Sequence, residues 1–107
     1  MYELKLINDG VRVNGKDYKV GHYIKAINDK SEIKFVGKIQ FRAYLDGEGY
    51  IDDQHLGFVV EDVDIPRMRR YTLIDLINTG WKLHITKTRP KVKVKLIKGK
   101  TIYEENQ

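Results

Sequence analysis

A thirteen-residue alternation in the middle of the chain most constrains its fold. Apolar or small residues recur at every second position from Ile33 to Leu45, in the segment IKFVGKIQFRAYL. A period of two is that of a β-strand, whose successive side chains point to opposite faces of a sheet. Gly37 is one of the alternating positions expected to face the core, and because it has no side chain a bend is favoured there. The pattern predicts one long, half-buried strand.

Two turn dipeptides predict a three-stranded meander before this strand. Asp-Gly at 9–10 and Asn-Gly at 14–15 supply the positive φ angles of two-residue hairpin turns. Pairing across the first turn places Leu6 opposite Val13. The alternation of apolar residues in these segments is that of a half-buried sheet.

Two short helices are also predicted. In residues 22–29, HYIKAIND, apolar residues stand one helical turn apart. In residues 72–80, TLIDLINTG, Thr72 can cap the helix N-terminus, Asp75 suits its first turn, and Gly80 is placed to end it.

Two alternating segments after the second helix predict a β-hairpin. They are WKLHIT at 81–86 and KVKVKL at 91–96, joined by a loop at 87–90. The apolar pairs of this register are Trp81–Leu96, Leu83–Val94 and Ile85–Val92. The same register brings like charges together, with Lys82 opposite Lys95, which is mildly unfavourable. Such a face is favoured where it binds an anion.

Together these patterns predict a single α+β domain over residues 1–107, with a mostly antiparallel sheet of six or seven strands and two short helices. A short polar tail is expected at about 104–107. The chain has no cysteine, which excludes a disulfide framework and fits a reducing cytoplasm. No apolar run has the length that crosses a bilayer, and no signal peptide is evident. We therefore expect a cytoplasmic protein that does not contact a membrane.

Charge is segregated along the chain, whose net charge is +5. Residues 43–66 contain seven carboxylates and neither Lys nor Arg, whereas residues 67–100 contain eleven basic residues and one acid. A basic face attracts anionic partners unless the acidic and basic segments lie side by side and neutralise each other. The relative placement of these segments therefore decides what the molecule can bind.

The basic hairpin predicts a small protein that binds DNA or RNA without catalysis or a cofactor. Lysines along a two-stranded ribbon suit phosphate backbones, and the RMRR segment at 67–70 would extend the surface. The expected site residues are Arg67, Arg69, Arg70, Lys82, His84, Arg89, Lys91, Lys93 and Lys95. No cysteine nucleophile, Gly-x-Ser-x-Gly elbow or P-loop is present, so no catalytic residue is expected. Protection of a strand edge by lysines is the alternative explanation.

A second hypothesis makes the acidic segment 46–64 the active surface of an adaptor or inhibitor. Carboxylates without neighbouring cations can mimic phosphates and occupy a basic groove on another protein. The residues of this surface would be Asp46, Glu48, Asp52, Asp53, Glu61, Asp62 and Asp64. Such an adaptor or inhibitor could be encoded by a mobile element, an idea suggested only by the small size and the richness in Lys, Ile and Asn. A third hypothesis, a metal-dependent nuclease, uses the same carboxylates, although they show no recognised ligand spacing.

Overall fold

A computed structural model describes residues 3–41, 57–64 and 69–105, which form ten β-strands and one α-helix. In chain order these are β1 (Leu4–Ile7), β2 (Gly10–Val13), β3 (Lys16–Lys19), β4 (Tyr23–Ile27), β5 (Ile33–Phe41), β6 (Phe58–Asp62), β7 (Arg70–Thr72), α1 (Leu73–Asn78), β8 (Lys82–Thr86), β9 (Val92–Ile97) and β10 (Lys100–Glu105).

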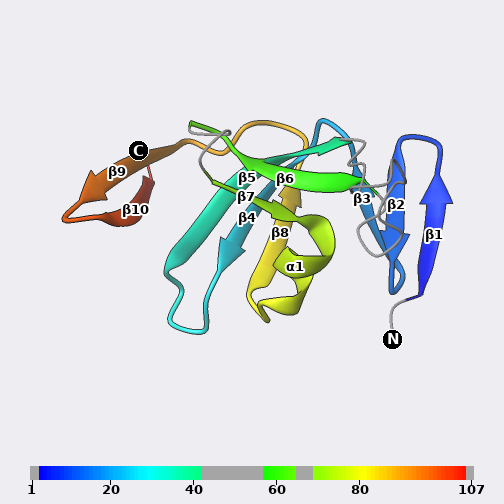
Figure 1. Ribbon diagram of the computed structural model, residues 1–107, viewed down its shortest axis with the longest axis horizontal. Helices are drawn as coiled ribbons and strands as arrows, with labels where there is room; N and C mark the ends of the chain where they lie inside the picture. Colours follow the sequence, from blue (N-terminus) through cyan, green and yellow to red (C-terminus); the bar gives the residue numbers. More distant parts are fainter. Residues whose placement is uncertain (1–2, 42–56, 65–68, 106–107) are drawn as a thin grey trace, which may run out of the picture.

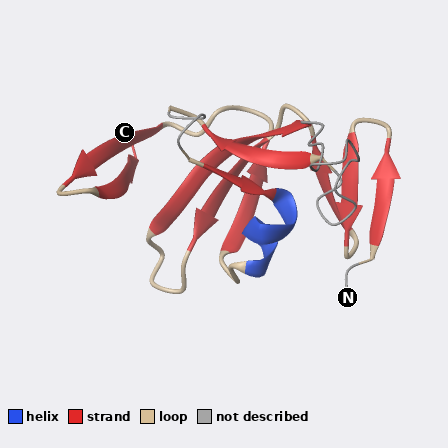
Figure 2. Cartoon of the chain, in the orientation of Figure 1, coloured by secondary structure: helices blue, strands red, loops and turns tan. Residues whose placement is uncertain are grey.

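The strands form three antiparallel sheets (Figures 1 and 2). A meander has the order β1-β2-β3, a central sheet has the order β7-β6-β5-β4-β8, and a hairpin joins β9 to β10. Buried residues from all three sheets and from α1 contribute to one hydrophobic core. The meander and the hairpin lie at opposite ends of the molecule.

The central sheet is built around β5, which forms the strand that the alternation predicted, although Val36 on its other face is also fully buried and Phe41 on its inward face is exposed. Phe35 and Ile39 are fully buried on this strand. A Cβ atom on Gly37 would lie 2.6 Å from Cγ1 of Val60, so the glycine allows close packing between β5 and β6. The last part of the alternation, residues 42–45, falls outside the described residues.

The meander forms as predicted, with a correction to its first turn. Leu6 lies opposite Val11 and not opposite Val13, because the chain turns one residue earlier than expected. Gly10 is the first residue of β2, where a Cβ atom would lie 2.0 Å from the carbonyl oxygen of Tyr18. This glycine therefore serves the close approach of β3 rather than the turn.

The helix predicted at 22–29 is wrong, because this segment forms β4 between β5 and β8. Ile24 and Ala26 are fully buried, whereas their neighbours Lys25 and Ile27 are partly exposed. This alternation has the period of a strand, and the segment is too short for its four-residue spacing to indicate a helix. Pairing on both sides then fixes β4 as a strand.

The helix predicted at 72–80 is confirmed as α1. The Thr72 hydroxyl accepts a hydrogen bond from the backbone N–H of Asp75 at 3.1 Å, which caps the helix. Leu73 and Leu76 are buried beneath it, and Gly80 follows its end with a φ of +78°. Because α1 is the one helix among the described residues, the fold is mostly antiparallel β with one short helix rather than two. Nowhere in these residues does a helix have the length and apolar character needed to cross a membrane.

The hairpin predicted between 81–86 and 91–96 is wrong in its pairing. Strand β8 pairs with β4, and β9 pairs with β10 across a turn in which Lys98 and Gly99 have φ angles of +51° and +76°. Positive φ at both central residues is the geometry of a tight hairpin turn. The expected polar tail is also corrected, because Glu104 and Glu105 are the last residues of β10.

The side chains of β8 and β9 are buried or exposed in the alternating order that the sequence predicted, with one exception. The side chains expected to face outward, Lys82, His84, Lys91, Lys93 and Lys95, are exposed. Trp81, Leu83, Ile85 and Val94 are half-buried and Val92 is buried, as their parity indicated. Leu96 was expected to be buried and is exposed, because β9 extends beyond the core at that point.

Candidate nucleic-acid interface

The β9–β10 hairpin carries the lysine row at one end of the molecule (Figure 1). Lys93 and Lys95 are two residues apart on β9, so their side chains share one face about 6.6 Å apart. Lys91 precedes them, and two further lysines lie at the turn and at the start of β10. The row of lysines on β9 therefore continues through Lys98 in the turn to Lys100, the first residue of β10.

A buried cluster, here called the anchor, fixes the base of the hairpin to the central sheet. It consists of Phe35, Asp62, Arg69 and Tyr103. The Tyr103 hydroxyl donates a hydrogen bond to Oδ2 of Asp62 at 2.6 Å, and Asp62 is almost completely buried. Burial, and then the hydrogen bond to this carboxylate, raise the pKa of Tyr103 above its usual value. The anchor joins β10 to the end of β6.

Arg69 belongs to the anchor and not to the exposed surface. Its guanidinium carbon lies 5.7 Å from the ring centroid of Phe35 and 5.5 Å from that of Tyr103. Its Nη2 donates to the carbonyl oxygen of Lys34 at 2.9 Å. These contacts give Arg69 a structural role.

The other arginines expected at the interface are separated. Arg67 falls outside the described residues. Arg70 is exposed on β7, opposite Glu61 on β6. The guanidinium of Arg89 forms an ion pair with Asp64. Arg69 and Arg89 are therefore engaged in contacts within the molecule, and Arg70 stands opposite Glu61 rather than on the hairpin.

The exposed side chains of β8 are those of Lys82, His84 and Thr86, and they lie beside β4 rather than β9. His84 lies directly opposite Lys25, and Thr86 lies opposite Tyr23. Lys82 stands at the other end of β8. The basic residues of β8 thus extend the central sheet face, and they are separate from the hairpin's lysine face.

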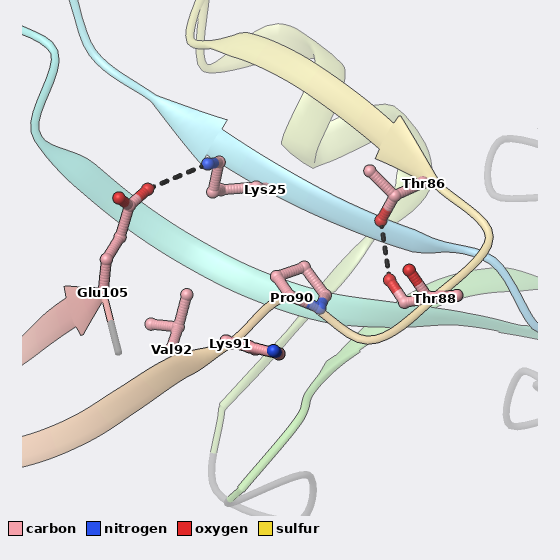
Figure 3. Close-up of a pocket in the computed structure, with 7 residues that line it drawn as sticks. All are labelled: Lys25, Thr86, Thr88, Pro90, Lys91, Val92 and Glu105. Atoms are coloured by element: carbon pink, nitrogen blue, oxygen red, sulfur yellow. Dashed lines mark hydrogen bonds and ion pairs between the residues drawn. The ribbon is translucent and has the colours of Figure 1, made fainter. Parts of the chain in front are cut away.

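An open cavity of about 290 Å³ joins these two regions (Figure 3). It is lined by Lys25, Thr86, Thr88, Pro90, Lys91, Val92 and Glu105. Lys25 points across the cavity toward Glu105, and its Nζ lies 3.0 Å from the carboxylate. The Thr86 hydroxyl donates to the carbonyl oxygen of Thr88 at 2.8 Å. The lining of the cavity thus combines apolar surface, which includes Pro90 and Val92, with two lysines and one carboxylate.

Intramolecular ion pairs neutralise part of the lysine row. Lys95 lies 2.9 Å from the carboxylate of Glu104, and both side chains are half exposed, so the pair is weak and easily exchanged. Lys91 and Lys93 form no ion pair among the described residues, although Glu104 lies directly opposite Lys93 in the hairpin. Lys98 and Lys100, which are also exposed, form none there either.

The acidic residues of the second hypothesis are only partly described. Asp46, Glu48, Asp52 and Asp53 lie outside the described residues. Of the rest, Asp62 is in the anchor, Asp64 pairs with Arg89, and Glu61 stands between Lys38 and Arg70 in the sheet. These three carboxylates therefore have basic or hydroxyl neighbours.

The described residues contain no group of three or more His, Asp or Glu side chains arranged to hold a metal ion. Comparison with known proteins gives no family assignment: no family model, no curated protein and no solved structure matches the chain.

Proposed function

We propose that the chain binds nucleic acid, with the lysines of the β9–β10 hairpin contacting backbone phosphates. The observation that carries the proposal is a projecting hairpin in which residues 91–100 include five lysines, while its two acidic residues, Glu104 and Glu105, lie at the end of β10 near its base. Lysines that neutralise phosphates release condensed counterions, and this release drives sequence-independent binding. Two-stranded ribbons of DNA-binding proteins enter the major or the minor groove.

Cationic groups beside the hairpin support the same proposal. Lys91 lies at the junction between the hairpin and the cavity, and Lys25 lines the same cavity. A phosphate in the cavity would compete with Glu105 for the ammonium group of Lys25. Contacts at the hairpin base would then add to those along its length.

Edge protection is the competing explanation for the lysines. Both strands of the hairpin have an unpaired outer edge, and lysines on exposed edges discourage pairing between molecules. The two explanations differ in their consequences. Removing lysines would promote self-association if they protect an edge, whereas it would weaken nucleic-acid binding if they contact phosphates.

Fluorescence anisotropy with a labelled duplex and a labelled single strand, at about 50 mM salt, tests the proposal. The test variant is Lys91→Ala/Lys93→Ala. The matched control is Lys5→Ala/Lys19→Ala, which removes the same charge from exposed or half-exposed positions in the meander, at the other end of the molecule. We expect the test variant to bind roughly tenfold more weakly or worse, because two phosphate contacts are lost, and the control to bind like the wild type.

Equal weakening in both variants would show a net-charge effect and no hairpin site. Absence of binding to either probe would refute the proposal. Self-association of the test variant with unchanged binding, measured by analytical ultracentrifugation, would identify the lysines as edge protection. Capture of a protein that survives nuclease treatment, without nucleic-acid binding, would favour the acidic-surface hypothesis.

A further inference from the structure

The exposure of apolar side chains rises along the β9–β10 hairpin toward its turn. At the base, Val92 and Tyr103 are 6% and 7% exposed. Near the turn, Ile102, Ile97 and Leu96 are 38%, 45% and 64% exposed. The hairpin is thus packed at its base and has three large exposed apolar side chains near its turn, here called the apolar end.

The apolar end has side chains on both faces of the ribbon. Ile97 and Ile102 are diagonal neighbours on the face that carries the lysine row. Leu96 points to the opposite face, because successive residues of a strand alternate. The surrounding cations are Lys95, Lys98 and Lys100. The result is a narrow apolar wedge bordered by ammonium groups.

A partner that covers this wedge must offer apolar surface directly beside negative charge. Stacked base pairs between two phosphate backbones have this combination, and proteins that kink DNA insert Leu or Ile side chains between base steps. We infer that the apolar end inserts between base pairs of duplex DNA and kinks it, while the flanking lysines hold the adjacent phosphates. This inference rests on the proposed function and adds the form of the nucleic acid and its deformation.

The extent of the lysine row favours a duplex over other partners with mixed apolar and anionic character. An anionic lipid surface would contact only the outer end of the hairpin. The row continues inward through Lys93 to Lys91, a distance of about 20 Å from the turn at strand spacing. A duplex can lie along that whole length. A second copy of the chain would bring like charges together.

Energy transfer between dyes at the two ends of a short duplex measures the kink. The test variant is Leu96→Ser/Ile97→Ser, whose side chains are exposed and whose loss should leave the fold intact. The control is Leu6→Ser in β1, since Leu6 is 68% exposed and Leu96 is 64% exposed. We expect the wild type and the control to kink the duplex by about 20–90°. The test variant should bind the intact duplex with the same salt dependence and leave it straight.

A duplex with a two-base bulge gives a second readout, because its bases are already partly unstacked. The wild type should bind it roughly tenfold tighter than the intact duplex, and the test variant should lose this preference. Binding without a kink and without the preference would overturn the inference and leave the proposed function standing. Absence of duplex binding at low salt would refute both.

Vesicles of phosphatidylcholine and phosphatidylglycerol, in a sedimentation assay, test the lipid alternative. The inference predicts that Leu96→Ser/Ile97→Ser changes DNA kinking and not vesicle capture. Strong vesicle capture that this variant abolishes, together with unkinked DNA, would assign the apolar end to a lipid surface and overturn the inference.

Discussion

At the scale of single residues, Asp62 stands out because its carboxylate is buried and therefore requires hydrogen-bond donors. It stands opposite Gly37 in the central sheet, accepts the hydroxyl hydrogen bond of Tyr103 and also accepts the backbone N–H of Asp64 at 2.8 Å. A buried carboxylate without such donors is costly. Tyr103 therefore links the stability of the core to the position of the hairpin.

Replacing Tyr103 by Phe should lower the free energy of unfolding by about 1–3 kcal/mol, because a buried acceptor loses its donor while the ring is kept. Urea denaturation followed by Trp81 fluorescence measures the change. Tyr23→Phe, on the partly exposed face of β4, is the control and should change stability by less than about 0.5 kcal/mol. Equal stability of the Tyr103→Phe variant and the wild type would contradict this role of the anchor.

Alkaline pH should destabilise the fold through two buried tyrosines. Burial raises the pKa of Tyr18, and burial with the Asp62 hydrogen bond raises that of Tyr103. Their folded-state pKa values exceed the unfolded value of about 10, so their contribution is fully present below pH 10 and is lost as pH rises above it. Urea titrations between about pH 9 and pH 11.5 should show falling stability. Tyr103→Phe should make the fall shallower, and a pH-independent stability would contradict the prediction.

At the scale of the elements, strand partners decide where the basic side chains stand. The pairing of β8 with β4 places His84 beside Lys25, whereas the pairing expected from the sequence placed it beside Lys93. In the observed pairing β9 has β10 as its partner, and the two form a separate hairpin outside the central sheet. The candidate interface therefore depends on this choice of partner.

Paired cysteines distinguish the two arrangements, because the chain has no cysteine of its own. Lys25→Cys/His84→Cys joins directly opposite residues, whose Cα atoms in an antiparallel pair lie within the range of about 4.4–6.8 Å that a disulfide requires. We expect it to form an intramolecular disulfide on mild oxidation. His84→Cys/Lys93→Cys should keep two free thiols, as counted by mass after alkylation. The reverse outcome would support the pairing expected from the sequence.

Periodicity predicted the strands β5, β8 and β9, but it did not predict β4 as a strand or the strand partners of β8 and β9. The alternation in β5, the capping of α1 by Thr72 and the outward side of Lys93 all follow from local sequence. Alternating apolar residues in β4, β8, β9 and β10 fit one another in several combinations, so their pairing is decided by contacts distant in sequence. The Lys98-Gly99 turn was the available signal for the β9–β10 hairpin.

The anchor could not be predicted from local patterns. Arg69 stands in a basic run, which is typical of an exposed surface. Its actual neighbours are Phe35, the carbonyl of Lys34 and Tyr103, which come from β5 and β10. Only the tertiary fold brings these groups around the guanidinium of Arg69. An arginine that the sequence predicted at the binding surface therefore has a structural role.

At the scale of the whole molecule, ion pairs among the described residues neutralise only part of the basic charge near the hairpin. Asp64 and Arg89 form one such pair, and Glu104 and Glu105 pair with Lys95 and Lys25. The hairpin beyond these pairs projects away from the meander, which lies at the far end of the long axis (Figure 1). Positive charge is thus concentrated on a projecting element, where an extended polyanion can reach it.

The salt dependence of duplex binding tests most directly whether the hairpin contacts phosphates. The logarithm of the association constant, plotted against the logarithm of salt concentration, has a slope of about −0.9 for each phosphate neutralised on duplex DNA. For Lys91→Ala/Lys93→Ala the slope should be smaller in magnitude by about 1.8 than for the wild type, whereas Lys5→Ala/Lys19→Ala should leave it unchanged. Equal slopes for the wild type and the hairpin variant would contradict a phosphate-binding hairpin.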